Sequence, residues 1–438
     1  MSLRSRIGTE LAAGLTSRGL RDFRRSVAET RRRIGGKTHQ VHYFHQVDDP
    51  YSHLAAQLLG PLVARYEVDL VPHLVGDADA VPEPEMLVAY ARKDAADIAP
   101  GYGMEFPGDA TPPEADVVRT ATRLLADVSP EVFVARAASV GTALWSGDRG
   151  ALEKLSQEMQ AADADTARAA VTAGTALRKR MGHYSGAMFA YGGEWYWGAD
   201  RLGHLEERLR LLGLARDASD VSDLVRRPGP GYLPGAEPDA PPVLEYFPSL
   251  RSPYTYISME RVYDLPRRYG IELRLRPVLP MVMRGMTVPV PKRMYITLDT
   301  KREAEDEGVP FGRVCDPVGE PVERGFALYP HACRLGRGGE YLLSFARGVF
   351  AEGIDAGTED GLRRIAERAG IDWDAAQEGR SDESWKEELE ENRAAMFEAG
   401  LWGVPSFRLL AGGGHAEFAT WGQDRIWLVE REIQRRLA

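Results

Sequence analysis

The sequence predicts an α/β protein built from two similar halves, and three observations support this fold class. First, 44% of the 438 residues are hydrophobic and 27% are charged, a globular composition that excludes a disordered or fibrous chain. Second, short apolar strand-like runs alternate with longer stretches of helical periodicity. Third, several residue patterns occur twice, about 200 positions apart. A chain of this length is expected to form two or three domains.

The internal repeat is carried by four groups of residues, and their separation grows from 203 to 224 positions along the chain, as insertions would produce. The matched groups are Tyr43-Phe44 and Pro50-Tyr51 with Tyr246-Phe247 and Pro253-Tyr254; Tyr90, Asp94, Gly103 and Phe106 with Tyr295, Asp299, Gly308 and Phe311; Phe189 with Phe407; and Trp197–Arg201 with Trp421–Arg425. We therefore predict a helical arm at 1–37, a first unit at 38–216, a linker rich in Pro and Gly at 217–242, and a second unit at 243–438.

The second unit shows the order of elements most clearly. The predicted elements are a strand at Val243–Phe247, a helix at Pro253–Tyr269, a strand at Glu272–Leu279, a helix-rich stretch at 299–400, strands at Ser406–Leu410 and Glu417–Thr420, and an amphipathic helix from Arg425. The first unit has the same coarse order. A β-α-β half, a helical insertion and a β-β-α half together indicate a fold of the thioredoxin type.

Charge is distributed unevenly. The net charge is −10, but residues 1–37 carry ten basic and three acidic residues, so the remainder is strongly acidic. An acidic body argues against nucleic-acid binding, which needs a basic face. The basic, amphipathic arm has two interpretations, which are docking on the acidic body of its own chain or contact with a membrane surface or an acidic partner. No run of about 18 or more apolar residues occurs, so no membrane span is expected. Charged residues interrupt the N-terminus and leave no continuous apolar stretch for a signal peptide, so no secretory signal is expected either.

The two cysteines, Cys315 and Cys333, provide no disulfide framework and fit a reducing, cytoplasmic compartment. A dithiol oxidoreductase of this fold needs Cys-x-x-Cys at the start of the first helix, and neither 47–51 nor 248–254 contains a cysteine. We predict no metal site, because we interpret the histidines of the first unit as ordinary surface and strand-end residues whose spacing alternates between the faces of a strand. These are His39, His42, His45 and His53.

Ser252 is the strongest candidate for a catalytic residue. Serine at the N-cap followed by Pro253 at the first helical position is a favoured way to start a helix. The same position offers free N–H groups and the positive end of the helix dipole, which favour an anion such as a thiolate. The residues by themselves leave both roles open. They also leave open whether Pro405 only marks a turn before a strand and whether Asp424 only caps the last helix.

Four segments of the second unit together resemble the motifs of 2-hydroxychromene-2-carboxylate isomerases and kappa-class glutathione transferases, in the DsbA-like branch of the thioredoxin superfamily. The resemblance covers nearly all of 243–438, and three of the motifs in the same order make it specific. The segments are Ser252-Pro253-Tyr254, Lys292-Arg293-Met294-Tyr295, Gly403-Val404-Pro405-Ser406-Phe407 and Trp421-Gly422-Gln423-Asp424-Arg425.

The resemblance implies a glutathione-dependent isomerase or transferase that acts on a small electrophilic compound, aromatic or enone-like. Ser252 would hydrogen-bond the glutathione sulfur, Val404 before a cis Pro405 would pair with the cysteinyl backbone, and Gln423 with Asp424 would hold the γ-glutamyl end. Met286 stands near a position where the family often has Asn, and Pro248 and Arg251 also differ from the usual approach to Ser-Pro. The cofactor that the resemblance implies is glutathione or another low-molecular-weight thiol.

The first unit departs further from these motifs. Asp49 stands at the position of Ser252, and Ala187 at that of Pro405. A carboxylate about 4 Å from a thiolate would cost roughly 4 kcal/mol at an effective dielectric constant of about 20, so we interpret this unit as a non-catalytic copy. Since the resembled families form homodimers, we expect the two units to pack as an intramolecular pseudo-dimer. The alternative function is a catalytically idle binding protein that uses the first unit and the basic arm to bind a partner.

Overall fold

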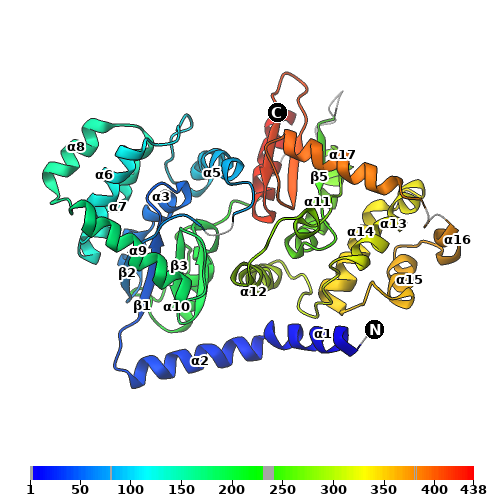
Figure 1. The fold of residues 1–438 in the computed structure, drawn as a ribbon, viewed down its shortest axis with the longest axis horizontal. Coiled ribbons are helices and arrows are strands. Elements are labelled where there is room, and N and C mark those ends of the chain that lie inside the picture. Colours follow the sequence, from blue (N-terminus) through cyan, green and yellow to red (C-terminus); the bar gives the residue numbers. More distant parts are fainter. Residues whose placement is uncertain (1–2, 79–80, 230–240, 379, 381) are drawn as a thin grey trace. The chain divides into compact units, whose positions relative to one another are not determined.

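The computed structural model describes residues 3–78, 81–229, 241–378, 380 and 382–438 (Figure 1). The chain forms two compact units, one of residues 22–228 and one of residues up to 21 together with those from 229 onward. We call them the N-terminal unit and the C-terminal unit. Among the described residues, no helix is long and apolar enough to cross a membrane.

The N-terminal unit is built on a four-stranded sheet in the order β2-β1-β3-β4, in which only β1 and β2 run parallel. Its strands are β1 (Gln40–His45), β2 (Asp69–Leu74), β3 (Met188–Tyr191) and β4 (Glu194–Trp197). Helices α3 (Pro50–Ala56) and α4 (Leu59–Arg65) connect β1 to β2, and α10 (Leu202–Leu211) follows β4. The insertion between β2 and β3 contains α5 (Pro84–Ile98), α6 (Ala115–Leu125), α7 (Pro130–Trp145), α8 (Arg149–Glu158) and α9 (Ala164–Arg180).

The C-terminal unit has a second four-stranded sheet with the equivalent order β6-β5-β7-β8. Its strands are β5 (Val243–Phe247), β6 (Glu272–Leu275), β7 (Ser406–Leu409) and β8 (Phe418–Trp421). Helix α11 (Pro253–Tyr269) connects the parallel strands β5 and β6, and α18 (Ile426–Leu437) ends the unit. Between β6 and β7 lie α12 (Val290–Asp306), α13 (Glu320–Arg334), α14 (Gly338–Arg347), α15 (Glu359–Arg368), α16 (Trp373–Glu378) and α17 (Ser384–Glu398).

The two sheets place the matched sequence positions at equivalent points. Tyr43 of β1 faces Phe189 of β3, as Tyr246 of β5 faces Phe407 of β7. At the start of the first helix after the sheet's first strand, the Tyr51 hydroxyl donates to Asp94 at 2.8 Å, and the Tyr254 hydroxyl donates to Asp299 at 2.7 Å. The α/β fold class is therefore confirmed. A tandem duplication as the origin of this likeness stays a prediction.

Several element boundaries differ from the prediction. Strand β6 ends at Leu275 rather than Leu279, because Pro277 lacks the N–H that would continue the ladder, although Val278 N–H still bonds the Pro248 carbonyl at 2.9 Å. The helical insertion begins with α12 at Val290, earlier than expected. Of the predicted linker, 217–228 belongs to the N-terminal unit, where Val225 is buried, and 230–240 lies outside the described residues.

The predicted helical arm consists of two helices, α1 (Leu3–Leu15) and α2 (Arg18–Ile34). In the C-terminal unit, Thr16, which directly follows α1, is buried and its hydroxyl donates to the Gly312 carbonyl at 3.2 Å. In the N-terminal unit, Arg25 of α2 pairs with Glu194 of β4 at 3.0 Å. The arm thus docks on acidic and polar groups of its own chain, the first of its two interpretations.

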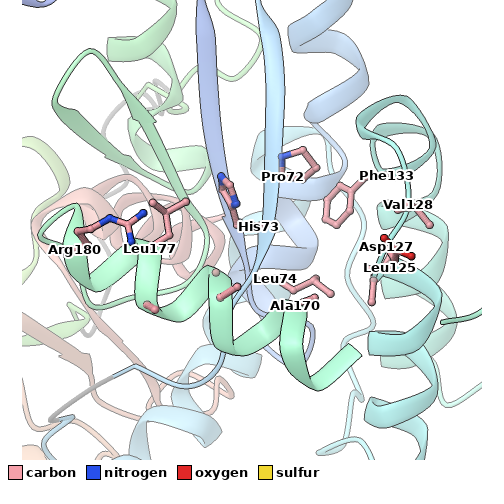
Figure 2. A pocket seen from close by; sticks show the side chains of 14 residues that line it. Pro72, His73, Leu74, Leu125, Asp127, Val128, Phe133, Ala170, Leu177 and Arg180 are labelled. Atoms are coloured by element: carbon pink, nitrogen blue, oxygen red, sulfur yellow. The ribbon is translucent and has the colours of Figure 1, made fainter. Parts of the chain in front are cut away.

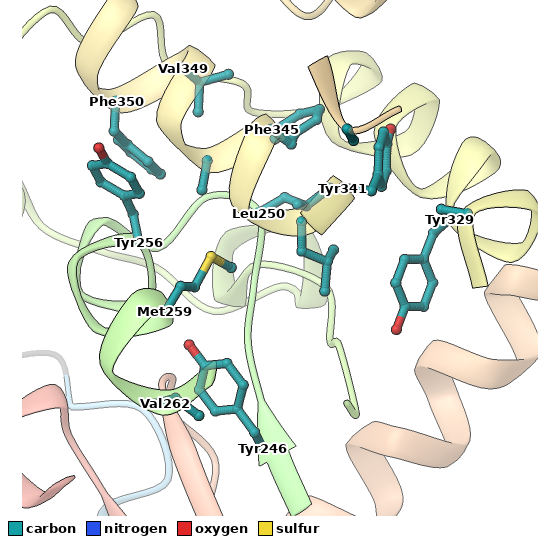
Figure 3. Packing of buried hydrophobic residues seen from close by; sticks show 14 of the residues in the cluster. Tyr246, Leu250, Tyr256, Met259, Val262, Tyr329, Tyr341, Phe345, Val349 and Phe350 are labelled. Carbon is teal, nitrogen blue, oxygen red and sulfur yellow. The ribbon is translucent and has the colours of Figure 1, made fainter. Parts of the chain in front are cut away.

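The core of the C-terminal unit fixes the turn between β5 and α11. Tyr246, Leu250 and Met259 from this region pack with Phe345 and Val349, which lie on and after α14 (Figure 3). Each of these side chains is at most 1% exposed. Burying such side chains is worth about 1.5–3 kcal/mol each, so the turn that carries Ser252 is anchored on both sides by core residues.

Two histidines of the N-terminal unit do not lie where the sequence predicts. His45 and His53 are buried rather than at the surface. Burial lowers the pKa of His45 to about 3 and that of His53 to about 4, so both rings are neutral at pH 7. The error has a physical reason, because the insertion covers them: the His45 ring packs edge-on against Phe133 of α7. Across the described ranges, no group of three or more His, Cys, Asp or Glu could hold a metal ion.

Candidate functional site

Ser252 caps helix α11. Its backbone is extended, with φ −99° and ψ 113°, and its Oγ accepts a hydrogen bond from the Thr255 N–H at 3.1 Å. Pro253 occupies the first turn, where its missing N–H leaves nothing unsatisfied. The side chain is half-buried. A hydroxyl has two acceptor lone pairs and one proton, so capping uses a lone pair and leaves the proton for another acceptor.

The loop before β7 brings Val404 and Pro405 to the same place. The Val404–Pro405 peptide bond is cis, as expected. The Ser252 hydroxyl lies 3.5 Å from the Val404 carbonyl oxygen, at the outer limit of a hydrogen bond. The Pro405 carbonyl accepts from the Gly422 N–H at 2.9 Å. The structure therefore joins the start of α11, the 404–405 loop and the end of β8, three segments that are far apart in the sequence.

Gln423 and Asp424 follow β8 in a 3₁₀ turn and are both buried. The amide of Gln423 is used inside the unit: its Oε1 accepts from Arg261 at 2.7 Å, and its Nε2 donates to Glu303 at 2.5 Å. Asp424 pairs with Arg425 at 3.5 Å. No motif in the sequence points to Arg261 or Glu303. Both stand inside helices, and no local pattern reveals a partner more than 100 residues away.

In the N-terminal unit, a carboxylate, that of Asp49, lies at the start of the equivalent helix, α3. Asp49 caps α3 and accepts from the Tyr51 N–H at 3.3 Å and the Ser52 N–H at 3.0 Å. The Ser52 hydroxyl donates to Asp49 at 2.7 Å and accepts from the Ala187 N–H at 3.0 Å. Burial raises the pKa of Asp49 to about 6, although the hydrogen bonds from Ser52 and Tyr51 act in the opposite direction and lower it. The donors that an external anion would use are therefore already occupied.

Comparison with known proteins shows the family to which most of the C-terminal unit belongs. Residues 243–434 match the family model of the DSBA-like thioredoxin domain. Residues 243–434 form a DSBA-like thioredoxin domain.

This domain is also similar to curated proteins named 2-hydroxychromene-2-carboxylate isomerase. The protein of Pseudomonas sp. (strain C18) is 22% identical over 199 residues, which are 44% of this chain and 90% of that protein. The protein of Pseudomonas putida is 22% identical over 201 residues, which are 44% of this chain and 95% of that protein. A solved structure of a 2-hydroxychromene-2-carboxylate isomerase is 23% identical, with a TM-score of 0.37, and the match covers 44% of this chain and 95% of that one.

Proposed function

We propose that the DSBA-like domain is an isomerase or transferase that uses a bound thiol, glutathione or a related low-molecular-weight thiol, to act on a small electrophilic compound. The observation that carries the proposal is the hydroxyl of Ser252. It sits half-buried at the start of α11, its proton is only loosely directed at the Val404 carbonyl, and no cysteine stands in that turn. The names of the similar curated proteins support an isomerase.

In the proposed mechanism, the Ser252 hydroxyl keeps its proton and donates a hydrogen bond to the sulfur of the bound thiol. Together with the N–H groups of the α11 start, this donor lowers the pKa of the thiol, so that the thiolate forms near neutral pH. When bound, the thiol would supply a nucleophile that adds reversibly to a conjugated carbon of the substrate and leaves again as a thiolate. An isomerisation of this kind would consume no oxidant or reductant, and a transferase would stop at the adduct.

Val404 and the 423–425 turn would hold the rest of the thiol. Val404 is proposed to pair with the cysteinyl backbone, on the loop shaped by Pro405. Asp424 is proposed to face the γ-glutamyl ammonium. Gln423, whose amide is bonded to Arg261 and Glu303, is proposed to contribute to this subsite by fixing the turn.

The experiment is calorimetric titration of glutathione into the full chain and two serine or threonine variants. Ser252→Ala removes the proposed donor and a helix cap. Thr358→Ala removes a cap away from the proposed thiol site: the Thr358 hydroxyl accepts from the Gly361 N–H at the start of α15, at 3.1 Å, and donates to the Asp355 carbonyl at 2.8 Å. Each change costs about 1 kcal/mol of stability. We expect one site per chain in the wild type and in Thr358→Ala.

Two measurements distinguish the capping role of Ser252 from its proposed hydrogen bond to the sulfur: the thiolate absorbance of bound glutathione and the rate of turnover. In Ser252→Ala, we expect the ultraviolet thiolate band of bound glutathione to disappear at neutral pH, and turnover of chromene or enone substrates to fall more than binding does. Equal losses in turnover and binding would assign Ser252 a capping role alone. No heat and no thermal shift at millimolar glutathione would refute glutathione as the thiol, and would favour the idle binding protein.

A further inference from the structure

The N-terminal unit contains a cavity of its own, remote in sequence from any residue of the proposed thiol site. Its volume is about 540 Å³, within the range of about 300–1,000 Å³ typical of small-molecule sites. The walls come from β2, from α9, and from the connection between α6 and α7, which includes Asp127 (Figure 2). All of these elements lie within one compact unit.

The lining of the cavity is mostly apolar. Leu74, Leu125 and Phe133 are each at most 5% exposed and form its buried wall. Helix α9 adds alanines at 170, 173 and 176, and its larger side chains at the cavity are Leu177 and Arg180. Such a wall favours a flat hydrocarbon group, and the Phe133 ring favours an aromatic one.

The close approach of α9 to β2 sets the position of the cavity. A Cβ atom on Gly174 would lie 2.0 Å from the Leu74 carbonyl oxygen, so only glycine permits this packing. Leu74 ends the edge strand of the sheet, and Pro72 in the same strand lacks an N–H. The helix therefore crosses the end of the strand tightly at one point and leaves the space beside it open.

Three polar side chains border this apolar space. Arg180 and Asp127 lie on opposite sides of it in Figure 2. Within the part of the chain that the structure describes, neither side chain forms a hydrogen bond or an ion pair with another residue. His73 stacks on Phe44 and on His42, and its Nε2 lies 2.9 Å from the Nδ1 of His42. Burial lowers the pKa of His73 to about 4, so its ring is neutral at pH 7 and adds no charge of its own. The cavity thus offers one cation and one anion, on opposite sides of an apolar centre.

We propose that this cavity binds an aromatic carboxylate that carries a hydroxyl group at its far end. The Arg180 guanidinium pairs with the carboxylate, the rings pack against Phe133 and the small face of α9, and Asp127 accepts from the hydroxyl. The site is independent of the thiol site and does not rest on the proposed activity. It gives the unit that lacks Ser252 and Pro405 a ligand-binding role of its own.

The test uses three fluorescent probes titrated into the full chain: 6-hydroxy-2-naphthoate, 2-naphthoate and 2-naphthol. They share the ring system and differ in the two polar groups. We expect one saturable site, with affinity falling when either group is missing. Arg180→Gln should weaken both naphthoates about fivefold, the upper range for an exposed charge pair, and leave 2-naphthol unchanged. Asp127→Asn should weaken only the two hydroxyl-bearing probes.

Two further variants locate the site. Ala173→Leu places a large side chain in the cavity from an exposed position, so it should abolish binding of all three probes without unfolding the chain. Ser252→Ala and saturating glutathione should leave probe binding unchanged, which separates this proposal from the proposed function. Unchanged binding in Ala173→Leu would overturn the site. Equal effects of Arg180→Gln on 2-naphthol and the naphthoates would overturn the pairing with Arg180.

Discussion

Replacing Ser252 by aspartate is the most direct test of the thiolate site. The N-terminal unit already has an aspartate, Asp49, at the equivalent position. Asp49 and Ser252 have the same φ of −99° and ψ values of 119° and 113°, and both cap the helix that follows. The Ser252→Asp variant should therefore keep the cap of α11 and the stability of the domain. What changes is the charge at the position where the sulfur would sit.

The size of the effect follows from the charge separation. A carboxylate about 4 Å from a thiolate costs roughly 4 kcal/mol at an effective dielectric constant of about 20. Since about 1.4 kcal/mol is tenfold, the thiolate form of the bound thiol should be disfavoured by about three orders of magnitude. The pKa of bound glutathione should rise by about three units relative to the wild type.

The assay is a pH titration of the thiolate absorbance of bound glutathione in the wild type, Ser252→Asp and Ser252→Asn. The asparagine variant has nearly the same shape and also caps helices, but it is neutral. We expect urea denaturation to give similar stabilities for all three proteins, and the thiolate to be lost near neutral pH chiefly in Ser252→Asp. If the aspartate and asparagine variants titrated alike, the sulfur would not lie at the start of α11 and the reasoning would be wrong.

Three further predictions concern the N-terminal unit. Because the pKa of Asp49 is raised to about 6, the folded protein binds a proton at Asp49 more tightly than the unfolded chain does. The free energy of unfolding of the wild type, relative to that of Asp49→Asn, should therefore fall by roughly 1–2 kcal/mol as the pH rises from about 4 to about 6. Urea denaturation measures this difference. Burial alone would raise the pKa of Glu194, but Arg208 and Arg25 lower it to about 2, so Arg25→Met should destabilise the unit by about 1 kcal/mol at pH 7 and progressively less as the pH falls from 4.5 toward 2. Gly174→Ala should cost more than about 2 kcal/mol and abolish naphthoate binding, and a melting curve like that of the wild type would contradict the packing of α9 on β2.

Much of the fold could be predicted from local patterns. Strand β5 and helix α11 have the predicted bounds, because an apolar β-branched run and a Ser-Pro helix start are both encoded within a few residues. Strand β6 ended early because a single proline interrupts the ladder, and the burial of His45 escaped prediction because the covering residue, Phe133, is 88 positions away in the sequence.

The sequence by itself determined the order of elements, the helix start at Ser252 and the charge difference between Ser252 and Asp49, since each depends on residue type and near neighbours. Only the tertiary structure decided which groups meet. It placed the Ser252 hydroxyl beside the Val404 carbonyl, tied Gln423 to Arg261 and Glu303, and opened a cavity beside Gly174. These contacts join segments from about 100 to more than 150 residues apart, and such pairings follow from the packing of whole elements around a core, which no local pattern encodes.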